Sequence, residues 1–350
     1  MSRRYSTLVV AAISLIVLSC VAFLVPVPYA TMRPGPAFNT LGEYRGEPMF
    51  EFTDDTTTYP VDGSLDFTTV RVSRADAHMT LAEAMQAWFS PNTKVVPEKL
   101  AHPGGETQEE SEQIGAAQLT SSKQSSQVAA LRAAGYTVPE YAEVVDVADD
   151  GTAKGSLKAD DAILRIDGVA TKTNSDVVDE VAGHDVGDSV RMLIRRDGKK
   201  RTVKFKIGKD PDDPDKPRIG VTIGRGFKLP VQITNNVGEQ IGGPSAGTMF
   251  ALAIYDRLVS DSLTGGAKIA GTGQISPEGE VGQIGGIRQK MAGAHEAGAT
   301  VFLVPAKNCK TATSGSDFGM RLVRISTLKD AITSLEKLAD DPEATVPTCK

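Results

Sequence analysis

The chain contains 350 residues, enough for two or three domains of ordinary size. Its 38 basic and 44 acidic residues give a formal net charge of −6, and no segment concentrates the positive charge that binding to nucleic acid requires. The 40% hydrophobic content excludes a wholly disordered chain, and three cysteines are too few for a disulfide scaffold.

Residues 1–32 are predicted to form a short cytoplasmic tip and a transmembrane anchor. Residues 8–27 are almost continuously apolar, and about 20 helical residues span a bilayer core of about 30 Å. Arg3 and Arg4 precede this run, so the positive-inside rule keeps the N-terminus in the cytoplasm. We therefore expect a single-pass protein of the cell membrane whose remaining chain is extracytoplasmic. Two alternatives stay open, a cleaved signal peptide and a lipoprotein attached at Cys20.

The other two cysteines, Cys309 and Cys349, both lie in the part of the chain expected to be exported. In an oxidising compartment they can form one disulfide, which would stabilise the fold by roughly 3–4 kcal/mol. Two independent thiols are the alternative.

Residues 33–134 read as a mixed α/β region. A strand is expected over 65–72, and Thr80 has the position of an N-cap for a helix that ends at Ser90. We expect the one tryptophan, Trp88, to pack in a core on this helix. A second, largely polar helix is expected over 106–134.

Residues 135–210 form a small, strand-rich unit in the sequence pattern. Its helix is expected to be capped by Ser175, and the turn signal Asp197-Gly198 predicts a hairpin. The expected strands are 142–147, 161–166, 190–196 and 201–207. Three prolines in 211–217 predict a stiff linker to a last domain over 218–350, which includes a C-terminal tail.

The run Gly155 to Gly168 is similar to the "G-x-L-x-x-G-D-x-I-x-x-I-D-G" pattern of permuted, protease-associated PDZ domains. Ala159-Asp160 stands where that pattern has x-Gly. The resemblance implies a domain that binds an extended peptide as an added strand at a sheet edge. The peptide groove that it implies lies at four residues: Tyr136, Tyr141, Ala142 and Val144.

The segment Gly242 to Gly247 combines three glycines with Pro244 and Ser245. An apolar pattern with helical spacing follows it and predicts a buried helix that begins near Ser245. Backbone amides at a helix N-terminus suit an oxyanion, whereas the alternative is a serine that only caps the helix. Taken by itself, this segment favours the capping role.

Lys290 lies on a second predicted helix, on the same side as Ile287, Ala294 and Ala297. Burial on an apolar face disfavours the ammonium form, and a neutral amine can take the proton from a serine hydroxyl. The alternative is a lysine whose amine reaches the solvent.

Read together, the two segments resemble the proteolytic domain of Lon, a Ser-Lys dyad peptidase, over about residues 220–340. Four ordered motifs carry the resemblance: Gly243–Gly247, Ala270–Ile275, Gly279–Lys290 and Val301–Asn308. Two positions depart from the family pattern, because Gly242 stands where an acidic residue is common and Gln274 where glutamate is frequent.

The resemblance implies a role for each matching residue. Ser245 is the nucleophile, Lys290 the general base, and Thr272 hydrogen-bonds and orients Lys290. Backbone amides around Gly243, Pro244 and Ser245 hold the oxyanion.

The chain carries no G-x4-G-K-[S/T] phosphate loop, so we expect neither an ATPase nor a nucleotide partner. The combination of anchor, PDZ domain and ATPase-free Lon domain is similar to bacterial membrane-anchored, PDZ-containing Lon-like serine proteases. In that family the PDZ domain can be inserted in the protease, and 33–134 would then complete the protease fold, with residues 65–72 joining its sheet.

The predicted fold class is therefore α+β: a transmembrane helix, a small β-rich PDZ domain and a Lon-type α+β domain. We expect an ATP-independent serine endopeptidase that cleaves extracytoplasmic polypeptides with help from the PDZ domain. The four histidines are scattered and no H-E-x-x-H occurs, so neither a metal nor another cofactor is expected. The alternative is a non-catalytic peptide-binding scaffold at the membrane, and a homo-oligomer stays open.

Overall fold

The computed structural model of the chain describes residues 3–53, 55–77, 79–238 and 240–349. The described chain forms two compact units, and each is treated by itself. Unit 1 combines residues 1–136 with 231–350, and unit 2 consists of residues 137–230, inserted between those two stretches. His78, one of the four histidines considered above, lies outside the described residues.

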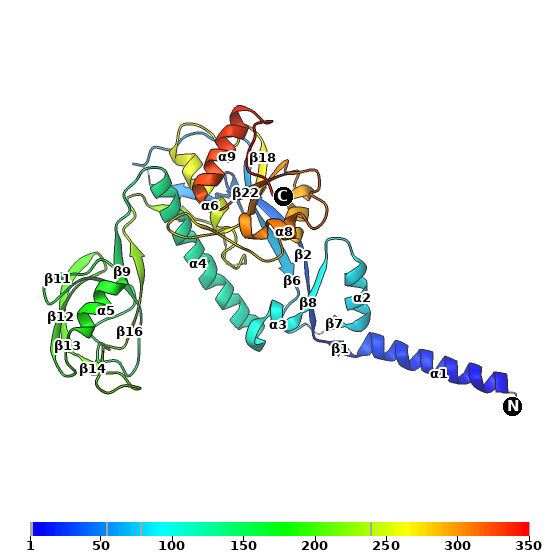
Figure 1. The fold of residues 1–350 in the computed structure, drawn as a ribbon, viewed down its shortest axis with the longest axis horizontal. Helices are drawn as coiled ribbons and strands as arrows, with labels where there is room; N and C mark the ends of the chain where they lie inside the picture. Colours follow the sequence, from blue (N-terminus) through cyan, green and yellow to red (C-terminus); the bar gives the residue numbers. More distant parts are fainter. Residues whose placement is uncertain (1–2, 54, 78, 239, 350) are drawn as a thin grey trace. The chain divides into compact units, whose positions relative to one another are not determined.

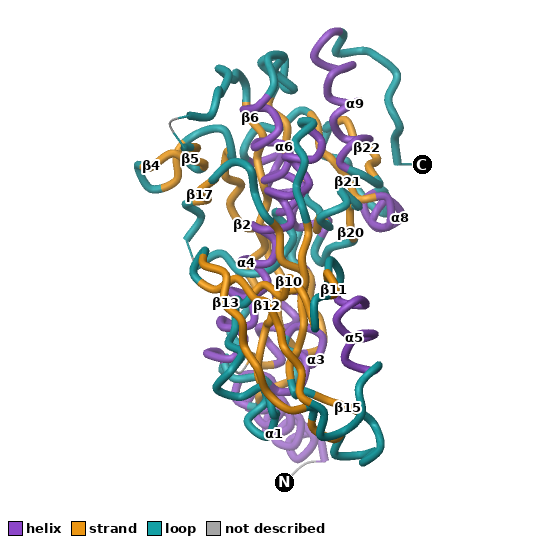
Figure 2. The backbone as a smooth tube through the Cα atoms, turned by 90° about the vertical axis from the view of Figure 1, so that its left-hand side faces the viewer, coloured by secondary structure: helices purple, strands orange, loops and turns teal. Residues whose placement is uncertain are grey.

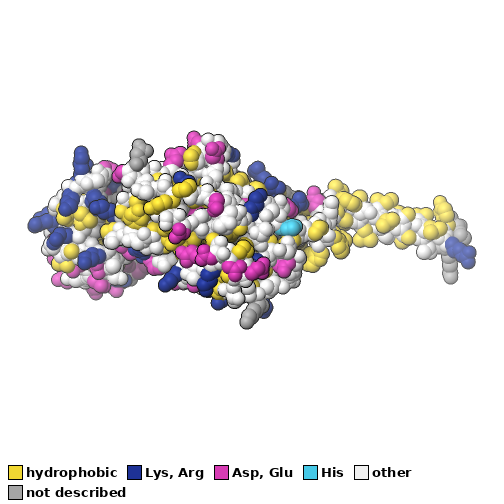
Figure 3. Space-filling model, turned by 90° about the horizontal axis from the view of Figure 1, so that it is seen from above, with side chains coloured by type: hydrophobic (Ala, Val, Ile, Leu, Met, Phe, Trp, Pro, Cys, Tyr) yellow, Lys and Arg dark blue, Asp and Glu magenta, His cyan; other side chains and the backbone are white. Residues whose placement is uncertain are grey.

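The N-terminal helix α1 (Arg3–Leu24) begins unit 1. Its hydrophobic side chains are exposed along its whole length (Figure 3). Residues Arg4–Leu24 are long and apolar enough to cross a membrane, and a signal sequence near the N-terminus has the same properties. Two residues after α1, strand β1 (Pro26–Val27) pairs with β7 (Met79–Thr80).

A six-stranded sheet in the order β22-β21-β18-β6-β2-β8 organises unit 1 (Figure 1). Its strands are β2 (Tyr29–Asn39), β6 (Ser64–Val72), β8 (Lys94–Pro97), β18 (Lys268–Gly271), β21 (Val301–Pro305) and β22 (Arg321–Ile325). Strand β6, the one expected at 65–72, pairs in parallel with β18 in the register Ser64↔Lys268 to Phe67↔Gly271. The sheet therefore joins a strand from before unit 2 to strands from after it.

Three helices pack on this sheet: α6 (Gly247–Leu258), α7 (Ile287–Glu296) and α9 (Leu328–Asp340). A fourth helix, α4 (Gln108–Ala133), packs on α6. Helix α4 begins at a capping box in which the Thr107 side chain and Glu110 satisfy each other's backbone N–H groups. Phe67 of β6 packs edge-to-face on Phe250 of α6, with ring centroids 5.3 Å apart. The smaller elements of unit 1 are β3 (Glu43–Tyr44), β4 (Glu47–Pro48), β5 (Phe50–Phe52), α3 (Glu98–Ala101), η1 (Pro103–Gly105), β17 (Ile233–Asn235), β19 (Gln274–Ile275), β20 (Val281–Gly282), η2 (Ala306–Asn308) and α8 (Cys309–Ala312).

Helix α2 (Leu81–Phe89) begins at the expected N-cap, Thr80, which forms a capping box with Glu83. The prediction that Trp88 packs in a core is wrong, because its side chain is 72% exposed. The side of α2 that is buried in unit 1 carries only Ala84 and Ala87. The apolar pattern therefore predicts the helix correctly, but it does not predict which face of the helix is buried against the rest of unit 1.

Unit 2 is built on a sheet in the order β13-β12-β10-β9-β16, with β11 paired to β10. Figure 2 shows β13, β12 and β10 beside one another. Its elements are β9 (Glu140–Val147), β10 (Ala162–Ile166), β11 (Val169–Ala170), α5 (Asn174–Ala182), β12 (Ser189–Arg196), β13 (Lys199–Lys206), β14 (Gly208–Lys209), β15 (Pro217–Arg218) and β16 (Val221–Phe227). The buried Asp161 carboxylate pairs with Arg196 at 2.6 Å, which fixes the start of β10 to the end of β12. The cap of α5 is Thr173, two residues before the expected Ser175, because Asp176 completes a capping box there.

The expected linker 211–217 is a loop inside unit 2 and not a boundary between domains. Strands β14 and β15 pair across it, and β16 then returns to the sheet to pair with β9 from Val221↔Val147 to Phe227↔Glu140. Unit 1 therefore resumes at Val231 and not at residue 218. The same pairing places the first and the last strand of unit 2 side by side.

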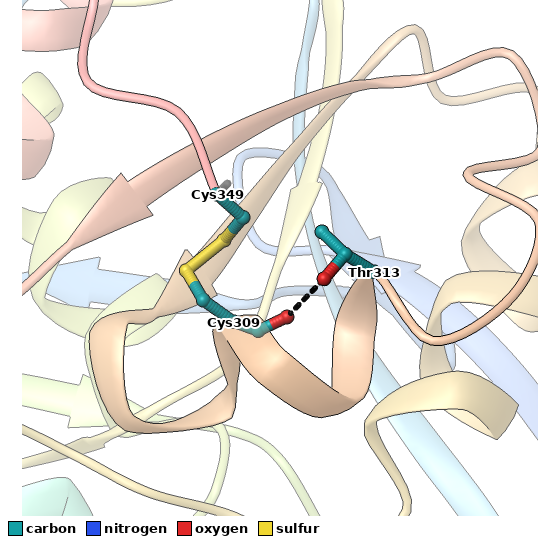
Figure 4. Close-up of a disulfide and its surroundings, with 3 residues drawn as sticks. All are labelled: Cys309, Thr313 and Cys349. Atoms are coloured by element: carbon teal, nitrogen blue, oxygen red, sulfur yellow. Dashed lines mark hydrogen bonds between the residues drawn. A yellow bond between two sulfur atoms is a disulfide. The ribbon is translucent and has the colours of Figure 1, made fainter.

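A disulfide joins Cys309 to Cys349, with the two Cα atoms 5.1 Å apart (Figure 4). The Thr313 hydroxyl donates a hydrogen bond to the Cys309 carbonyl and closes the short helix that carries it. The C-terminal tail runs along β22, where Thr348 bridges to Val323 and the Arg324 N–H donates to the Pro347 carbonyl. The tail therefore covers part of the outer edge of the six-stranded sheet.

Candidate active site

Ser245 lies in the loop that leads into α6, two residues before the first helical residue. Its carbonyl oxygen accepts hydrogen bonds from the Gly273 N–H at 2.8 Å and from the Thr272 hydroxyl at 3.0 Å. A Cβ atom at Gly247 would come within 2.7 Å of Ser122 Oγ and 2.8 Å of Ile275 Cγ2. The loop can therefore approach α4 and β19 this closely only with glycine at that position.

Lys290 comes to Ser245 from α7, and its side chain is 2% exposed. Its amine, Nζ, lies 3.0 Å from Ser245 Oγ and donates a hydrogen bond to the Thr68 carbonyl at 2.5 Å. Burial lowers the pKa of Lys290 from the ordinary lysine value to about 7. A substantial share of the lysine is therefore neutral at pH 7, and a neutral amine can accept a proton.

Two glycines bring α7 and Lys290 close to the sheet. Gly286 begins the helix with φ of +66°, a conformation that favours glycine. Gly293 lies one turn beyond Lys290, and a Cβ atom there would come within 2.4 Å of the Gly35 carbonyl oxygen of β2. The position of the amine therefore depends on backbone-to-backbone contact between α7 and β2.

Thr272 takes a different place from the expected one. Its hydroxyl donates to the Ser245 carbonyl and so holds the backbone of Ser245, not the amine of Lys290. The partner of Lys290 is the Thr68 carbonyl of β6, 222 positions away in the sequence. Sequence reasoning missed this partner because any residue type supplies a backbone carbonyl.

The backbone N–H groups expected to hold an oxyanion differ in whether they already donate a hydrogen bond within the protein. The Gly243 N–H donates to the Gly115 carbonyl of α4 at 2.9 Å, and Pro244 has no N–H. The Ser245 N–H makes no hydrogen bond to a residue that the structure describes. Of the three predicted residues, Ser245 therefore offers the free donor.

A cavity of about 490 Å³ opens beside the pair of side chains. Its walls come from strand β6, the β2 segment before it and the loop that carries Ser245. The lining residues are Pro36, Phe38, Glu43, Tyr44, Arg45, Phe67, Thr68, Thr69, Val70, Arg71, Gln240, Ile241, Gly242, Gly243, Ser245, Ala246 and Lys290. The cavity combines aromatic walls with the part of β6 after Phe67, where the pairing with β18 has ended, and this combination suits an extended segment of polypeptide.

The peptide groove predicted for unit 2 is misplaced. Ala142 and Val144 are fully buried in the core of unit 2, and Tyr136 belongs to unit 1. Tyr141 is half-buried under the guanidinium of Arg195, at 4.7 Å from its ring centroid. At the predicted groove residues β9 is paired on both sides: Ala142 pairs with β10 and β16, and the Val144 N–H donates to the Asp161 carbonyl, so these residues offer no free edge for an added strand.

The sheet has edge strands at β13 and β16, and β16 is the one next to α5. The Asn174 side chain at the start of α5 donates to the Ile223 carbonyl of β16 at 3.3 Å. Gly220, with φ of +72°, makes the turn into β16 and approaches Gly151 closely. The alternating apolar stretch 219–223, which contains Gly220, is the sequence signal for this strand, although the prolines before it predict the start of the last domain there.

Comparison with known proteins agrees with both units. The family model of the Lon protease (S16) C-terminal proteolytic domain matches residues 239–318, which include Ser245, Thr272 and Lys290. The PDZ domain family model matches residues 118–207, which begin within α4 and end before β16. The chain carries a Lon-type proteolytic domain and a PDZ domain.

Curated relatives resemble the last part of the chain. Lon protease 2 of Herpetosiphon aurantiacus is 36% identical over 94 residues, which are 27% of this chain and 11% of that protein. The Lon protease of Campylobacter concisus is 35% identical over 120 residues, 34% of this chain and 14% of that protein. The chain thus spans about a tenth of the length of the curated relatives it matches.

Among solved structures, the PDZ domain of an SdrC-like protein from Listeria monocytogenes is 31% identical. The match covers 24% of this chain and 86% of that one, with a TM-score of 0.22.

Proposed function

Because the chain carries a Lon-type proteolytic domain and a PDZ domain, we propose that it is an ATP-independent serine endopeptidase with a Ser245–Lys290 dyad. The observation that carries the proposal is the 3.0 Å separation between Lys290 Nζ and Ser245 Oγ, inside a site where the amine is buried. At that distance a proton can pass directly between the two atoms.

The reaction follows the usual two steps of acyl transfer. Ser245 Oγ attacks the scissile carbonyl carbon while neutral Lys290 takes the hydroxyl proton. The ammonium then gives that proton to the departing amine, which leaves an ester between Ser245 and the acyl half of the substrate. In the second step water attacks this ester, and Lys290 again takes and returns the proton.

The Ser245 N–H is the proposed donor to the oxyanion, because it is the one of the three expected positions without a hydrogen bond to a described residue. The Gly243 N–H can join it only if its bond to the Gly115 carbonyl opens. Thr272 fixes the carbonyl side of Ser245 and so holds this amide in place.

We propose that the substrate is an extended or locally unfolded polypeptide lying in the cavity beside β6. Residues 33–134 supply β2, β6 and α4, and we propose that they complete the protease fold around the catalytic elements. The PDZ domain would receive a further stretch of the polypeptide as an added strand at β16, beside α5.

We further propose that α1 stays in the cell membrane as a single-pass anchor, with its N-terminus in the cytoplasm and both units outside. The apolar length of the helix, the two arginines before it and the Cys309–Cys349 disulfide support this placement. The lipid bilayer is then a partner of the protein along with its polypeptide substrates.

The proposal is tested with Ser245→Ala and Lys290→Met in the full chain, assayed on an unfolded, fluorescently labelled protein without nucleotide. Each change should lower cleavage by about 10³-fold or more, because the nucleophile and its base act as a unit. Ser314→Ala and Lys310→Met are the matched controls, since both residues are exposed and lie in unit 1. Undiminished cleavage in either dyad variant, with the fold retained by circular dichroism, would contradict the dyad.

A further inference from the structure

Helix α2 presents an apolar face that unit 1 does not cover. The side chains of Met85, Trp88 and Phe89 are 53%, 72% and 80% exposed, and Leu81 on the same face is also exposed. At about 100° per residue these four positions fall within one third of the helix circumference. A continuous apolar stripe of this kind on a surface helix needs an environment other than water.

The other sides of α2 are already accounted for. Ala84 and Ala87 pack against unit 1, and Glu83 closes the capping box at Thr80. The exposed stripe therefore lies beside the alanine face, and the rest of unit 1 leaves it largely uncovered. The buried contact of α2 is made by two small alanine side chains, whereas the side chains of the stripe are large and exposed, so the stripe is not part of that contact.

The chain places α2 directly beside the end of α1. Helix α1 ends at Leu24, and the strand that follows it pairs with the strand that precedes α2 in the register Pro26↔Thr80 and Val27↔Met79. Thr80 is also the N-cap of α2, so the helix begins at the partner of Pro26. Figure 1 shows α2, β7 and β1 together at the body end of α1.

We propose that α2 lies in the interface of the bilayer that α1 spans and inserts its stripe of Leu81, Met85, Trp88 and Phe89 among the lipid headgroups and upper acyl chains. Tryptophan favours this depth because its indole ring is largely apolar and also carries a polar N–H group. A short amphipathic helix with a large apolar face binds there by burying that face. Exposed Leu100 of α3 and exposed lysines at 94 and 99 lie in the segments that follow α2, and lysines at this depth pair with anionic headgroups.

The inference depends on the proposed anchor, because only a retained α1 holds α2 at the membrane. It has a consequence for the site, since α2 fixes unit 1 to the bilayer at a second point. One helix alone leaves a protein free to tilt and turn on the membrane, whereas two attachments limit its orientation.

Trp88 is the only tryptophan of the chain, so its intrinsic fluorescence tests the inference directly. The full chain is reconstituted in vesicles of phosphatidylcholine and phosphatidylglycerol, with and without acyl chains brominated near the headgroup. We expect the brominated lipid to quench Trp88 by about twofold or more, with blue-shifted emission and protection from aqueous acrylamide. The matched control is the double variant Trp88→Phe and Glu336→Trp, which moves the tryptophan to an exposed position on α9. That control should show no quenching by the lipid and full access to acrylamide.

Flotation of the same vesicles separates this inference from the anchor. If the chain floats but Trp88 is quenched no more than the control, the anchor stands and the interfacial role of α2 is overturned. Protection of Trp88 from acrylamide without quenching by lipid also overturns it, in favour of a protein partner on the stripe. A chain that does not float overturns the anchor and this inference together, and leaves the peptidase assay as a separate result.

Discussion

Lys290 is placed where a charged amine is least stable and where a neutral amine is most useful. Its Nζ is held between the Thr68 carbonyl and Ser245 Oγ, and burial lowers its pKa to about 7. A base whose pKa lies near the pH at which it works is neutral often enough to accept a proton and still basic enough to remove one. This balance comes from burial, with no other cause of the shift.

The pH dependence of cleavage follows from this pKa. Below about pH 7 the amine is protonated and cannot accept the Ser245 proton, so kcat/KM should fall about tenfold for each pH unit. Above about pH 7 the amine is neutral, and kcat/KM should level off. The measurement is kcat/KM for a peptide substrate between about pH 5 and 9, with the fold checked at each pH. A profile that is flat, or that falls as the pH rises from about 6 to 8, would count against Lys290 as the base.

At the scale of residues, the sequence predicts the catalytic side chains but not the backbone groups that hydrogen-bond to them. The motifs around Ser245 and Lys290 predicted a pair, and the structure places the two atoms 3.0 Å apart. The roles of the Thr68 carbonyl and of the Gly243 N–H bond to Gly115 depend on strands and helices distant in the sequence. No residue type marks such partners, since every residue has a carbonyl and nearly every residue an N–H.

At the scale of elements, the contact between α7 and β2 decides where Lys290 lies. The two backbones meet at Gly293 and Gly35 with no room for a side chain between them. Any added atom there must push α7 away from the sheet, and Lys290 is carried on the preceding turn. The activity of the site should therefore be sensitive to a single methyl group outside it.

Gly293→Ala tests this dependence. Its Cβ atom would come within 2.4 Å of the Gly35 carbonyl oxygen, so we expect a loss of stability of about 1–3 kcal/mol. Cleavage of the peptide should fall by about tenfold or more in the fraction that remains folded, because the dyad distance increases. Gly285→Ala is the control: it lies just before α7, and a Cβ atom there meets nothing within 4 Å. Equal activity and melting temperature in the two variants would refute the proposed role of the contact.

Capping residues and turn glycines made the elements themselves predictable. The predicted cap Thr80 begins α2, and the Asp197-Gly198 turn has positive φ at both positions, as a tight hairpin requires. The environment of α2 was not predictable in the same way. Its apolar stripe matches a core-facing helix in the sequence, because periodicity identifies a face without saying what covers it.

At the scale of the whole molecule, the disulfide closes the C-terminal tail over the outer edge of the sheet. Cys309 and Cys349 are 40 positions apart, and none of the residues proposed for catalysis lies between β22 and Cys349. The bridge should therefore affect the stability of unit 1 far more than the geometry of the dyad.

Cys349→Ser should lower the free energy of unfolding by roughly 3–4 kcal/mol, because a loop of this length gains that much chain entropy in the unfolded state. Cleavage at a temperature well below the melting point should stay within about twofold of the parent. The free energy of unfolding is measured by denaturant titration under oxidising conditions. Adding a thiol reductant should lower the stability of the parent protein to that of the Cys349→Ser variant. Cys20→Ser is the control, since Cys20 is a free cysteine in α1. Parent and Cys349→Ser proteins of equal stability would show that the bridge does not form.

The boundaries of the units were the least predictable feature. The prolines of 211–217 indicated a linker, whereas the chain makes one more strand of unit 2 after them. A proline-rich composition predicts a break in regular secondary structure but not a domain boundary. The pairing of β16 with β9 is what shows that the next strand belongs to unit 2.

That pairing also bears on how the protease domain can assemble. Thr68 and Gly271, which meet across β6 and β18, are 203 positions apart, and parallel strands that distant usually form slowly. Once Glu140 and Phe227 have paired, however, the 137–230 segment is closed at its base and no longer adds its own length to the loop. Because each doubling of loop length costs only about 0.6 kcal/mol, a whole folded domain can sit in the middle of the protease with little effect on its folding equilibrium. We therefore expect a kinetic order in which early folding of the inserted domain shortens the loop between β6 and β18 and so speeds their pairing.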